Sequence, residues 1–437
     1  MVLLAVQVGV ACRSDDDQVR TPGPAAGIVL PLAFEHRHAL ADKAAWFEDK
    51  IGRSHLTSHG LLAYQIDPQR DDAFPTARAD MAIWSGVYLA AEAFRYQATR
   101  STDASDRLDV LVGGIESLVR VTGKPGLLAR SIRRREGSEP LTDHWHRSPT
   151  DPDVLWLGNV SVDQLDGIVF GAGAAFDALD DGPSRRRVVE WTRAVVGHLV
   201  DHDMRIEDIT GRPTKHSDFT CGFLSESLNC LIALSAVKVA HHVTGEERFE
   251  RAYAALVRRG YAERAVAARR PWWERVTGVN HSDNHLAFLA YYHLIRYEED
   301  PRLLDLYHRS LRRAWSVVRR EKNAFFTLVY HSLTPRSGWD HAALADAVET
   351  LTRFPTASSR YDPEATRCMA ARADRLGRPQ TCRPLPIDER PPASVEWNQN
   401  PSRWGRGGTG DRRAFSGFDF LTAYWLGRAH GFIPGDA

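Results

Sequence analysis

Residues 161–175 read SVDQLDGIVFGAGAA, and this stretch decides the fold. It opens with two carboxylates, Asp163 and Asp166, and continues as an apolar segment rich in Gly and Ala. Acidic side chains are favoured in the first turn of a helix. Small side chains allow neighbouring helices to approach each other closely. The stretch therefore predicts the start of a crowded helix, as in the inner layer of a helical protein.

Five other stretches repeat this pattern loosely. In each, an Asp stands at or near an expected helix start, and small or aromatic residues follow at helical spacing. Strand-like alternation is almost absent from the chain. Starts 55 to 83 residues apart are too distant for one helix and suit a helical hairpin with a loop. The six copies start near residues 80, 163, 218, 283, 340 and 419.

More polar segments lie between these copies, and they carry charge on one face, as outer helices do. Arg251, Arg258 and Arg259 form one such face. We expect outer helices around residues 36–52, 104–121, 184–202, 246–266 and 301–320.

Six hairpins with small-residue inner helices resemble the six-hairpin, or (α/α)6-barrel, superfamily of glycoside hydrolases, polysaccharide lyases and sugar epimerases. The resemblance covers residues 35–432 and rests on architecture, not on a catalytic motif. It implies an all-α fold, with one (α/α)6 toroid as a single domain over 35–437. A solenoid of stacked helical repeats is the alternative, although the irregular gaps between copies disfavour it.

Length and composition agree with such a domain. A chain of 437 residues is long for one compact domain, yet it suits one large toroid. Lys plus Arg and Asp plus Glu number 56 each, so no strongly basic surface for nucleic acid is expected. Twelve Trp and twelve Tyr residues offer flat, amphipathic rings that suit the faces of sugars.

The N-terminal region predicts export. A short apolar run ends in Gly9-Val10-Ala11-Cys12, which resembles the lipobox of bacterial lipoproteins. We therefore expect a signal segment over 1–12, a lipid on Cys12 and a flexible tether over 13–34. The protein would then lie in the bacterial cell envelope, as a periplasmic or cell-surface lipoprotein. An ordinary unstructured N-terminus is the alternative.

Residues 355–413 break the helical pattern because they contain many prolines. A stretch of this length without helices, inside a compact domain, is usually functional or disordered. We predict an irregular, lid-like insertion that lies across the mouth of the ring and narrows access to it. Its polar aromatic patch would contact the ligand through Trp397, Asn398 and Trp404.

Besides Cys12, the sequence contains two pairs of cysteines in different surroundings. A disulfide between Cys368 and Cys382 would staple the insertion in an oxidising compartment. Cys221 and Cys230 fall within one apolar helical segment and are expected to be buried thiols.

Paired carboxylates are the candidate catalytic groups. In an (α/α) toroid, equivalent ends of the inner helices surround a central cavity, so the repeated carboxylates are expected to converge there. Two carboxyls can divide the work of acid and base in glycoside hydrolysis. Simple helix capping, worth about 1 kcal/mol, is the alternative for each of them. The candidates are Asp80, Asp163, Asp166, Asp218, Glu226 and Asp283.

Polar and aromatic residues beside these carboxylates are candidates for substrate binding. His281 and His285 share a helix face and have the spacing of metal ligands. No further ligand motif accompanies them, so we favour hydrogen bonds to a sugar and expect neither a metal nor a cofactor. Besides the residues of the insertion, the candidates are Trp84, Gln164, His216, Asn280, His281 and His285.

Three functions remain open at this point. The first is an exported glycoside hydrolase that uses two carboxylates. The second is a uronate lyase or sugar epimerase, in which His281 or His285 and a tyrosine move a proton. The third is a non-catalytic lipoprotein that binds a carbohydrate or another polar small molecule. One architecture hosts many reactions, so the fold alone does not choose among them.

Overall fold

The computed structural model describes the chain in nine stretches that begin at Leu40 and end at Gly435. No helix among these residues is long and apolar enough to cross a bilayer. Cys12 and Glu226 lie outside the described residues. The residues left out are 1–39, 68–78, 136–140, 142–143, 222–226, 269–273, 275–277, 357–367, 406–412 and 436–437.

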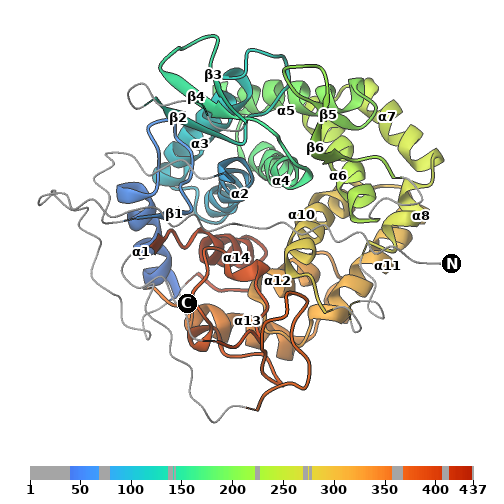
Figure 1. Ribbon diagram of the computed structural model, residues 1–437. Coiled ribbons are helices and arrows are strands. Elements are labelled where there is room, and N and C mark those ends of the chain that lie inside the picture. The colour runs from blue at the N-terminus through green and yellow to red at the C-terminus, as the bar shows by residue number, and fades with distance from the viewer. Residues whose placement is uncertain are drawn as a thin grey trace, which may run out of the picture.

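Six helices of the described chain line the centre of a ring (Figure 1). Each of them contacts the next along the chain, and the last contacts the first, so the ring is closed. This architecture confirms the predicted all-α toroid of six hairpins. The inner helices are α2 (Met81–Thr99), α4 (Val162–Ala178), α6 (Ser227–Thr244), α10 (His281–Tyr297), α12 (Ala324–Ser332) and α14 (Phe418–Ala429).

The outer helices cover the ring from outside and bury one face each. In α11, for example, Leu303, Tyr307 and Leu311 point inward while arginines face solvent. All five predicted outer segments are confirmed, with ends shifted by a few residues. The outer helices are α1 (Leu40–Ser54), α3 (Thr102–Arg120), α5 (Pro183–Asp201), α7 (Glu247–Arg258) with α8 (Tyr261–Ala265), α11 (Pro301–Val318) and α13 (His341–Thr352).

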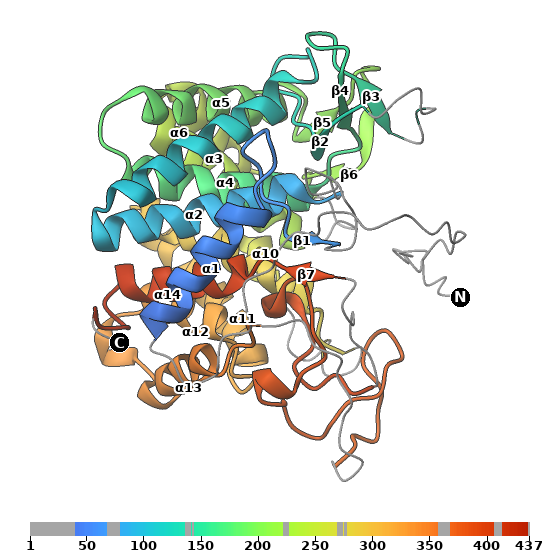
Figure 2. The same ribbon diagram turned by 90° about the vertical axis from the view of Figure 1, so that its left-hand side faces the viewer.

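Short antiparallel strands gather at one end of the ring (Figure 2). They lie at the N-terminal ends of inner helices. The backbone N–H of Ala82 in α2 donates a hydrogen bond to the carbonyl of Arg130, just before β2. The hydroxyl of Thr214 in β6 donates one to the carbonyl of Val160, just before α4. The pairs are β1 (Gln65–Ile66) with β7 (Ala414–Phe415), β4 (Val154–Leu157) with both β2 (Ser131–Arg134) and β3 (Trp145–Arg147), and β5 (Arg205–Glu207) with β6 (Pro213–Asp218).

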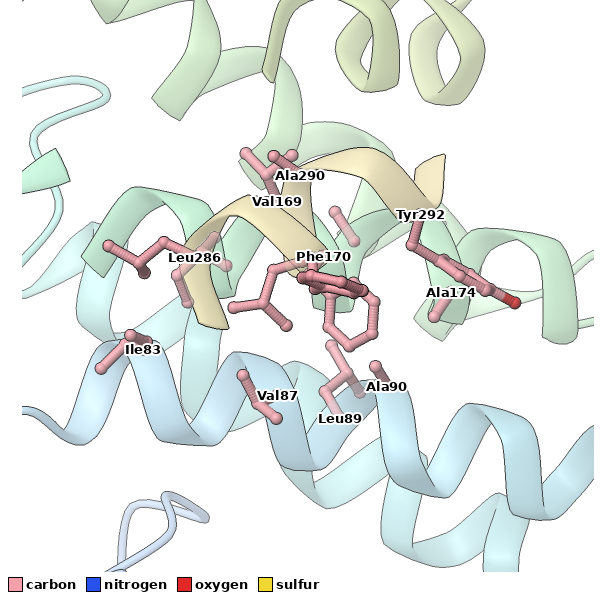
Figure 3. Packing of buried hydrophobic residues seen from close by; sticks show 14 of the residues in the cluster. Ile83, Val87, Leu89, Ala90, Val169, Phe170, Ala174, Leu286, Ala290 and Tyr292 are labelled. Carbon is pink, nitrogen blue, oxygen red and sulfur yellow. The ribbon is translucent and has the colours of Figure 1, made fainter. Parts of the chain in front are cut away.

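Apolar side chains fill the centre of the ring. The rings of Phe94 in α2, Phe170 in α4 and Tyr292 in α10 meet edge to face at 5.5–6.1 Å, and Phe325 of α12 joins them through Phe170. Figure 3 shows Phe170 between the aliphatic side chains of α2 and α10. Edge-to-face contacts of this kind stabilise beyond the burial of their area. The core therefore runs through the ring, and the polar groups lie at its ends.

Glycines bring the backbones of α2 and α4 into direct contact. A Cβ atom added to Gly86 would lie 2.2 Å from the carbonyl oxygen of Gly167, and one added to Gly171 would lie 2.4 Å from that of Gly86. No residue with a side chain fits at such a distance. The small residues that led us to predict crowded inner helices are thus required at this crossing.

Two copies of the repeated motif were assigned wrongly. Asp340 caps the outer helix α13 by accepting a hydrogen bond from Ala343, whereas the inner helix of that hairpin, α12, begins after Asn323. Asp218 ends strand β6 and does not start a helix; α6 begins at Ser227. The capping preference of Asp applies to outer helices and turns as well as to inner helices.

The cysteines form two disulfides. Cys368 pairs with Cys382, as the sequence suggested. Cys221 pairs with Cys230 across the start of α6, so the expectation of two buried thiols was wrong. Cys221 lies before the helix, whereas Cys230 lies in its first turn.

The contact between α2 and α4 predicts an unusual effect of Gly86→Ala. In an ordinary helix this change stabilises by about 0.5–1 kcal/mol. Here the added methyl group collides with a backbone, so we expect a loss of about 1–3 kcal/mol in the free energy of unfolding. Urea denaturation measures the difference. Gly52→Ala in α1 is the matched control, because only the flexible end of Arg107 lies nearby. Equal effects of the two changes would contradict the packing argument.

Candidate functional site

Three carboxylates from three inner helices lie close together at the strand-bearing end of the ring. Asp80 directly precedes α2, while Asp163 and Asp283 stand in the first turns of α4 and α10. The pKa of Asp163 is raised, first by burial and then by the negative charges of Asp80 and Asp283. These three inner-helix copies of the motif therefore lie together, whereas the fourth, Asp419 in the first turn of α14, is buried and accepts a hydrogen bond from the backbone N–H of Glu396.

Asp163 combines access to solvent with a raised pKa. Its surface is exposed, yet the surrounding protein and the two neighbouring carboxylates oppose ionisation. The side chain of Ser161 at the helix start makes no capping bond, and the Asp163 carboxylate accepts a hydrogen bond from its own backbone N–H, which lowers its pKa by less than burial raises it. An accessible carboxyl whose pKa is raised is suited to donate a proton to a bound ligand.

Asp80 does not cap its helix either. Its carboxylate accepts a hydrogen bond from Arg130 at 2.7 Å and another from Nε2 of Gln164 at 2.9 Å. The same Gln164 accepts a bond from the backbone N–H of Ile83 through Oε1, so α4 supplies the cap of α2. Gln164 is buried, and its observed contacts hold Asp80 in place.

Asp166 lies beneath Asp163, one turn further along α4. It is 1% exposed, and burial, followed by the charge of Asp163, raises its pKa well above the usual range. Among the described residues, its Oδ2 atom has no hydrogen-bond partner. Asn284 on α10 is also fully buried, and neither its amide oxygen nor its amide nitrogen is paired within the described part of the chain. The helices that carry Asp163 and Asp283 thus each bury a further polar side chain close to their N-termini.

Trp84 and His285 form a stacked pair in the wall of the site. Their ring centroids are 5.7 Å apart, and both side chains are buried; Phe418 also packs on the indole, with ring centroids 5.5 Å apart. Burial lowers the pKa of His285 to about 3, so the imidazole is neutral. The two rings pack against each other and not against open space, which differs from the sugar platform that we expected.

His281 and Asn280 have partners within the protein. Nε2 of His281 lies 3.0 Å from both carboxylate oxygens of Glu321, and the histidine is buried. Asn280 caps α10 by accepting a hydrogen bond from the backbone N–H of Asp283. No group of three or more His, Cys, Asp or Glu side chains among the described residues is arranged to hold a metal ion.

His216 and Asp218 reach the same end of the ring on strand β6. His216 is exposed and near enough to Arg130 for the two to interact electrostatically; its pKa is lowered, mainly by desolvation. Asp218 accepts hydrogen bonds from the backbone and hydroxyl of Thr220, as in a common turn. No described contact joins Asp218 to Asp163.

The insertion does not present Trp397 to a ligand. This tryptophan is 1% exposed, donates a hydrogen bond to the carbonyl of Asp419 and packs on Phe354, so our expectation of a ligand-binding side chain was wrong. Asn398 and Trp404 are half-buried. A tryptophan in a proline-rich segment is equally able to anchor that segment in the core, and here it does so.

Arg130 was missed by the sequence analysis. It binds the Asp80 carboxylate, and its charge also lowers the pKa of Asp163. Nothing in its local sequence marks it, because it stands in a connection between α3 and β2 and acquires its partner only through the fold. The site is therefore three carboxylates with one arginine.

Comparison with known proteins gives likeness in structure only. No family model and no curated protein matches the sequence. A GH76 alpha-mannanase of Bacteroides thetaiotaomicron is 10% identical, with 90% of this chain and 95% of that chain covered, at a TM-score of 0.48. A GH76A alpha-1,6-mannanase of Salegentibacter is 9% identical, with 90% and 99% covered, at 0.47. A thermostable endoglucanase of Alicyclobacillus acidocaldarius is 12% identical, with 80% and 73% covered, at 0.42.

The electrostatics of the site predict how the pKa of Asp163 responds to its neighbours. We expect a pKa above the ordinary aspartate value of about 3.9, measured by carboxyl NMR titration. Asp80→Asn removes a like charge and should lower this pKa. Arg130→Gln removes an opposite charge and should raise it. A pKa of Asp163 that is indifferent to both changes would show that the groups do not share one site.

Proposed function

We propose that this protein is an exported carbohydrate-active enzyme, a glycoside hydrolase that acts at Asp80, Asp163 and Asp283. One observation carries the proposal: three carboxylates from three different helices lie together, and the accessible one has a raised pKa. Glycoside hydrolysis needs a protonated carboxyl for the leaving group and an ionised one opposite it.

The surroundings suggest a division of roles. Asp163 would protonate the departing oxygen, because burial and like charges favour its neutral form. Asp80, which is ion-paired with Arg130, would supply the ionised carboxylate as base or nucleophile. Asp283 would keep the pKa of Asp163 high by its charge. The buried carboxyl Asp166 would stay out of contact with the substrate.

A lyase or epimerase is the second candidate, and the histidines argue against it. His285 is buried under Trp84, and His281 is engaged by Glu321. Neither ring is placed to take a proton from a bound uronate without moving. A non-catalytic binding protein would not need a raised pKa at an accessible carboxyl.

The proposal predicts the effect of Asp163→Asn on catalysis. This change preserves shape and removes the proton donor, so kcat for glycan cleavage should fall about 10²–10⁴-fold. Release of reducing ends from a panel of α-mannans, cellulosic glucans and uronate-containing glycans measures it. Asp305→Asn, on the exposed face of α11, is the matched control and should leave kcat unchanged.

Two results would overturn the assignment. If Asp163→Asn and the control are equally active on a substrate that the wild-type protein cleaves, the carboxylate cluster is not the catalytic site. If cleavage yields an unsaturated product, the reaction is elimination and the lyase alternative replaces hydrolysis.

We also propose that the protein is anchored in the bacterial cell envelope by a lipid on Cys12. The lipobox-like Gly9-Val10-Ala11-Cys12 supports this proposal. Labelling with a radioactive palmitate precursor should mark the wild-type protein but not Cys12→Ala, and only the labelled form should partition with membranes. Equal labelling of the two proteins, or none in either, would exclude the anchor.

A further inference from the structure

Asp80 stands where a helix-capping residue is expected, yet its side chain does not cap. An Asp directly before a helix usually accepts a hydrogen bond from a backbone N–H of the first turn. Asp340 does so at α13, with an extended backbone at φ −88° and ψ 94°. Asp80 has φ −120° and ψ 34° and makes no such bond to α2. Its carboxylate is therefore available for another task.

Gln164 of α4 supplies the cap that Asp80 leaves out. Its Oε1 atom accepts a hydrogen bond from the backbone N–H of Ile83, in the first turn of α2, at 3.2 Å. An N–H can only donate, so this contact fixes which end of the amide faces which neighbour. The nitrogen, Nε2, then faces Asp80 and donates to Oδ1 at 2.9 Å. Gln164 is 1% exposed, so its side chain has little freedom to turn.

The donors that hold Asp80 converge on one of its two oxygens. Oδ1 accepts from Gln164 and also from Nη2 of Arg130, at 2.7 Å. Arg130 is itself fixed, because Nε donates to the carbonyl of Ala79 and Nη1 donates to that of Asn159. No described residue donates a hydrogen bond to Oδ2 of Asp80, although 37% of this side chain is exposed. The oxygen that can meet a ligand is therefore Oδ2.

The arrangement fixes the direction of Oδ2. Two donors on one oxygen define the plane of the carboxylate, and both donors are anchored to the backbone of the protein. A reacting atom that is already oriented needs no reorganisation when its substrate binds. Asp163, the proposed proton donor, directly precedes Gln164 on α4. One turn of α4 thus carries the proton donor and also orients the carboxylate of α2.

We propose that Gln164 is a positioning residue: by capping α2 in place of Asp80, it frees the Asp80 carboxylate and holds Oδ2 toward the substrate. The inference rests on the proposed function, in which Asp80 is the base or nucleophile. Gln164 itself does not reach the substrate, because it is buried and both ends of its amide are engaged. Without it, the unpaired N–H of Ile83 would draw Asp80 into the ordinary capping position, away from the site.

Gln164→Leu tests the position of Asp80 without an activity assay. The pKa of Asp163 is raised by burial and then by the charge of Asp80. If Asp80 turns to cap α2, this pKa should fall, as it should in Asp80→Asn, and carboxyl NMR titration measures it. An unchanged pKa of Asp163 in Gln164→Leu would overturn the positioning role, whether or not the protein cleaves a glycan.

Gln164→Glu tests the hydrogen bond to Asp80 during catalysis. The change keeps an oxygen for Ile83 and replaces the amide donor by a carboxyl. We expect kcat at pH 7 to fall about 10–100-fold, with little change in KM. The ratio of this kcat to the wild-type value should rise as the pH is lowered toward about 4, because a protonated carboxyl donates to Asp80 and an ionised one repels it. A loss by the same factor at every pH, or no loss, would contradict the inference.

Asn323→Asp is the matched control. Asn323 also caps an inner helix through its oxygen, by accepting a hydrogen bond from the backbone of Phe326, and its nitrogen donates to the carbonyl of Trp397. Neither partner is a carboxylate of the site. The control should therefore keep the wild-type kcat and the wild-type pKa of Asp163, even where its melting temperature falls. Equal losses of kcat in Asn323→Asp and Gln164→Glu would reduce the effect to a weakened cap and overturn the positioning role.

The proposed function fails by a different result. If Asp163→Asn cleaves a glycan as fast as the wild-type protein does, the carboxylate cluster is not catalytic. The pKa of Asp163 in Gln164→Leu still decides, in that case, whether Gln164 positions Asp80. If this pKa falls while kcat of Gln164→Leu stays at the wild-type value, the position of Asp80 does not matter for the reaction, and the assignment of Oδ2 is wrong.

Discussion

The contact of the α2 and α4 backbones at Gly86, Gly167 and Gly171 determines the geometry of the carboxylate site. Gly86 and Gly167 each stand in the second turn of their helix, so their contact places the two N-termini side by side. Only for that reason can Gln164 of α4 reach both the backbone of α2 and the carboxylate of Asp80. A wider crossing, such as larger residues would impose, would separate Asp80 from Asp163 and remove their electrostatic interaction. The site therefore depends on residues that never touch a ligand.

Much of the ring could be predicted because its local signals agree. Helical periodicity, charged outer faces and small inner residues all indicate paired helices, and each is a property of neighbouring residues. The fifth inner helix, α12, escaped detection because its cap is Asn323 and no acidic residue follows in its first turn. Asp340, by contrast, caps an outer helix with the same chemistry. A capping residue marks the start of a helix but does not indicate whether the helix lies in the inner or the outer layer.

The functional site, too, could be predicted from the sequence only in part. Carboxylates at helix starts could be found from spacing, whereas Arg130 could not, because its pairing with Asp80 joins residues 50 positions apart. The roles of Trp84 and Trp397 were also beyond the sequence. A tryptophan suits a sugar platform and a core equally well, and only burial distinguishes the two uses. Both side chains proved to be buried.

The ring is closed by its first and last hairpins, and this has a consequence for synthesis on the ribosome. Glu48 of α1 accepts hydrogen bonds from Tyr88 of α2 and from Trp425 of α14, the helix nearest the C-terminus. A chain made from its N-terminus carries this buried glutamate half-paired until the final helix emerges. The nascent protein must therefore keep one side of its first hairpin uncovered throughout translation. The seam between α1 and α14 is where a chaperone would be needed longest. A circular permutation that joins the chain across this seam and opens it elsewhere would disturb the finished ring least.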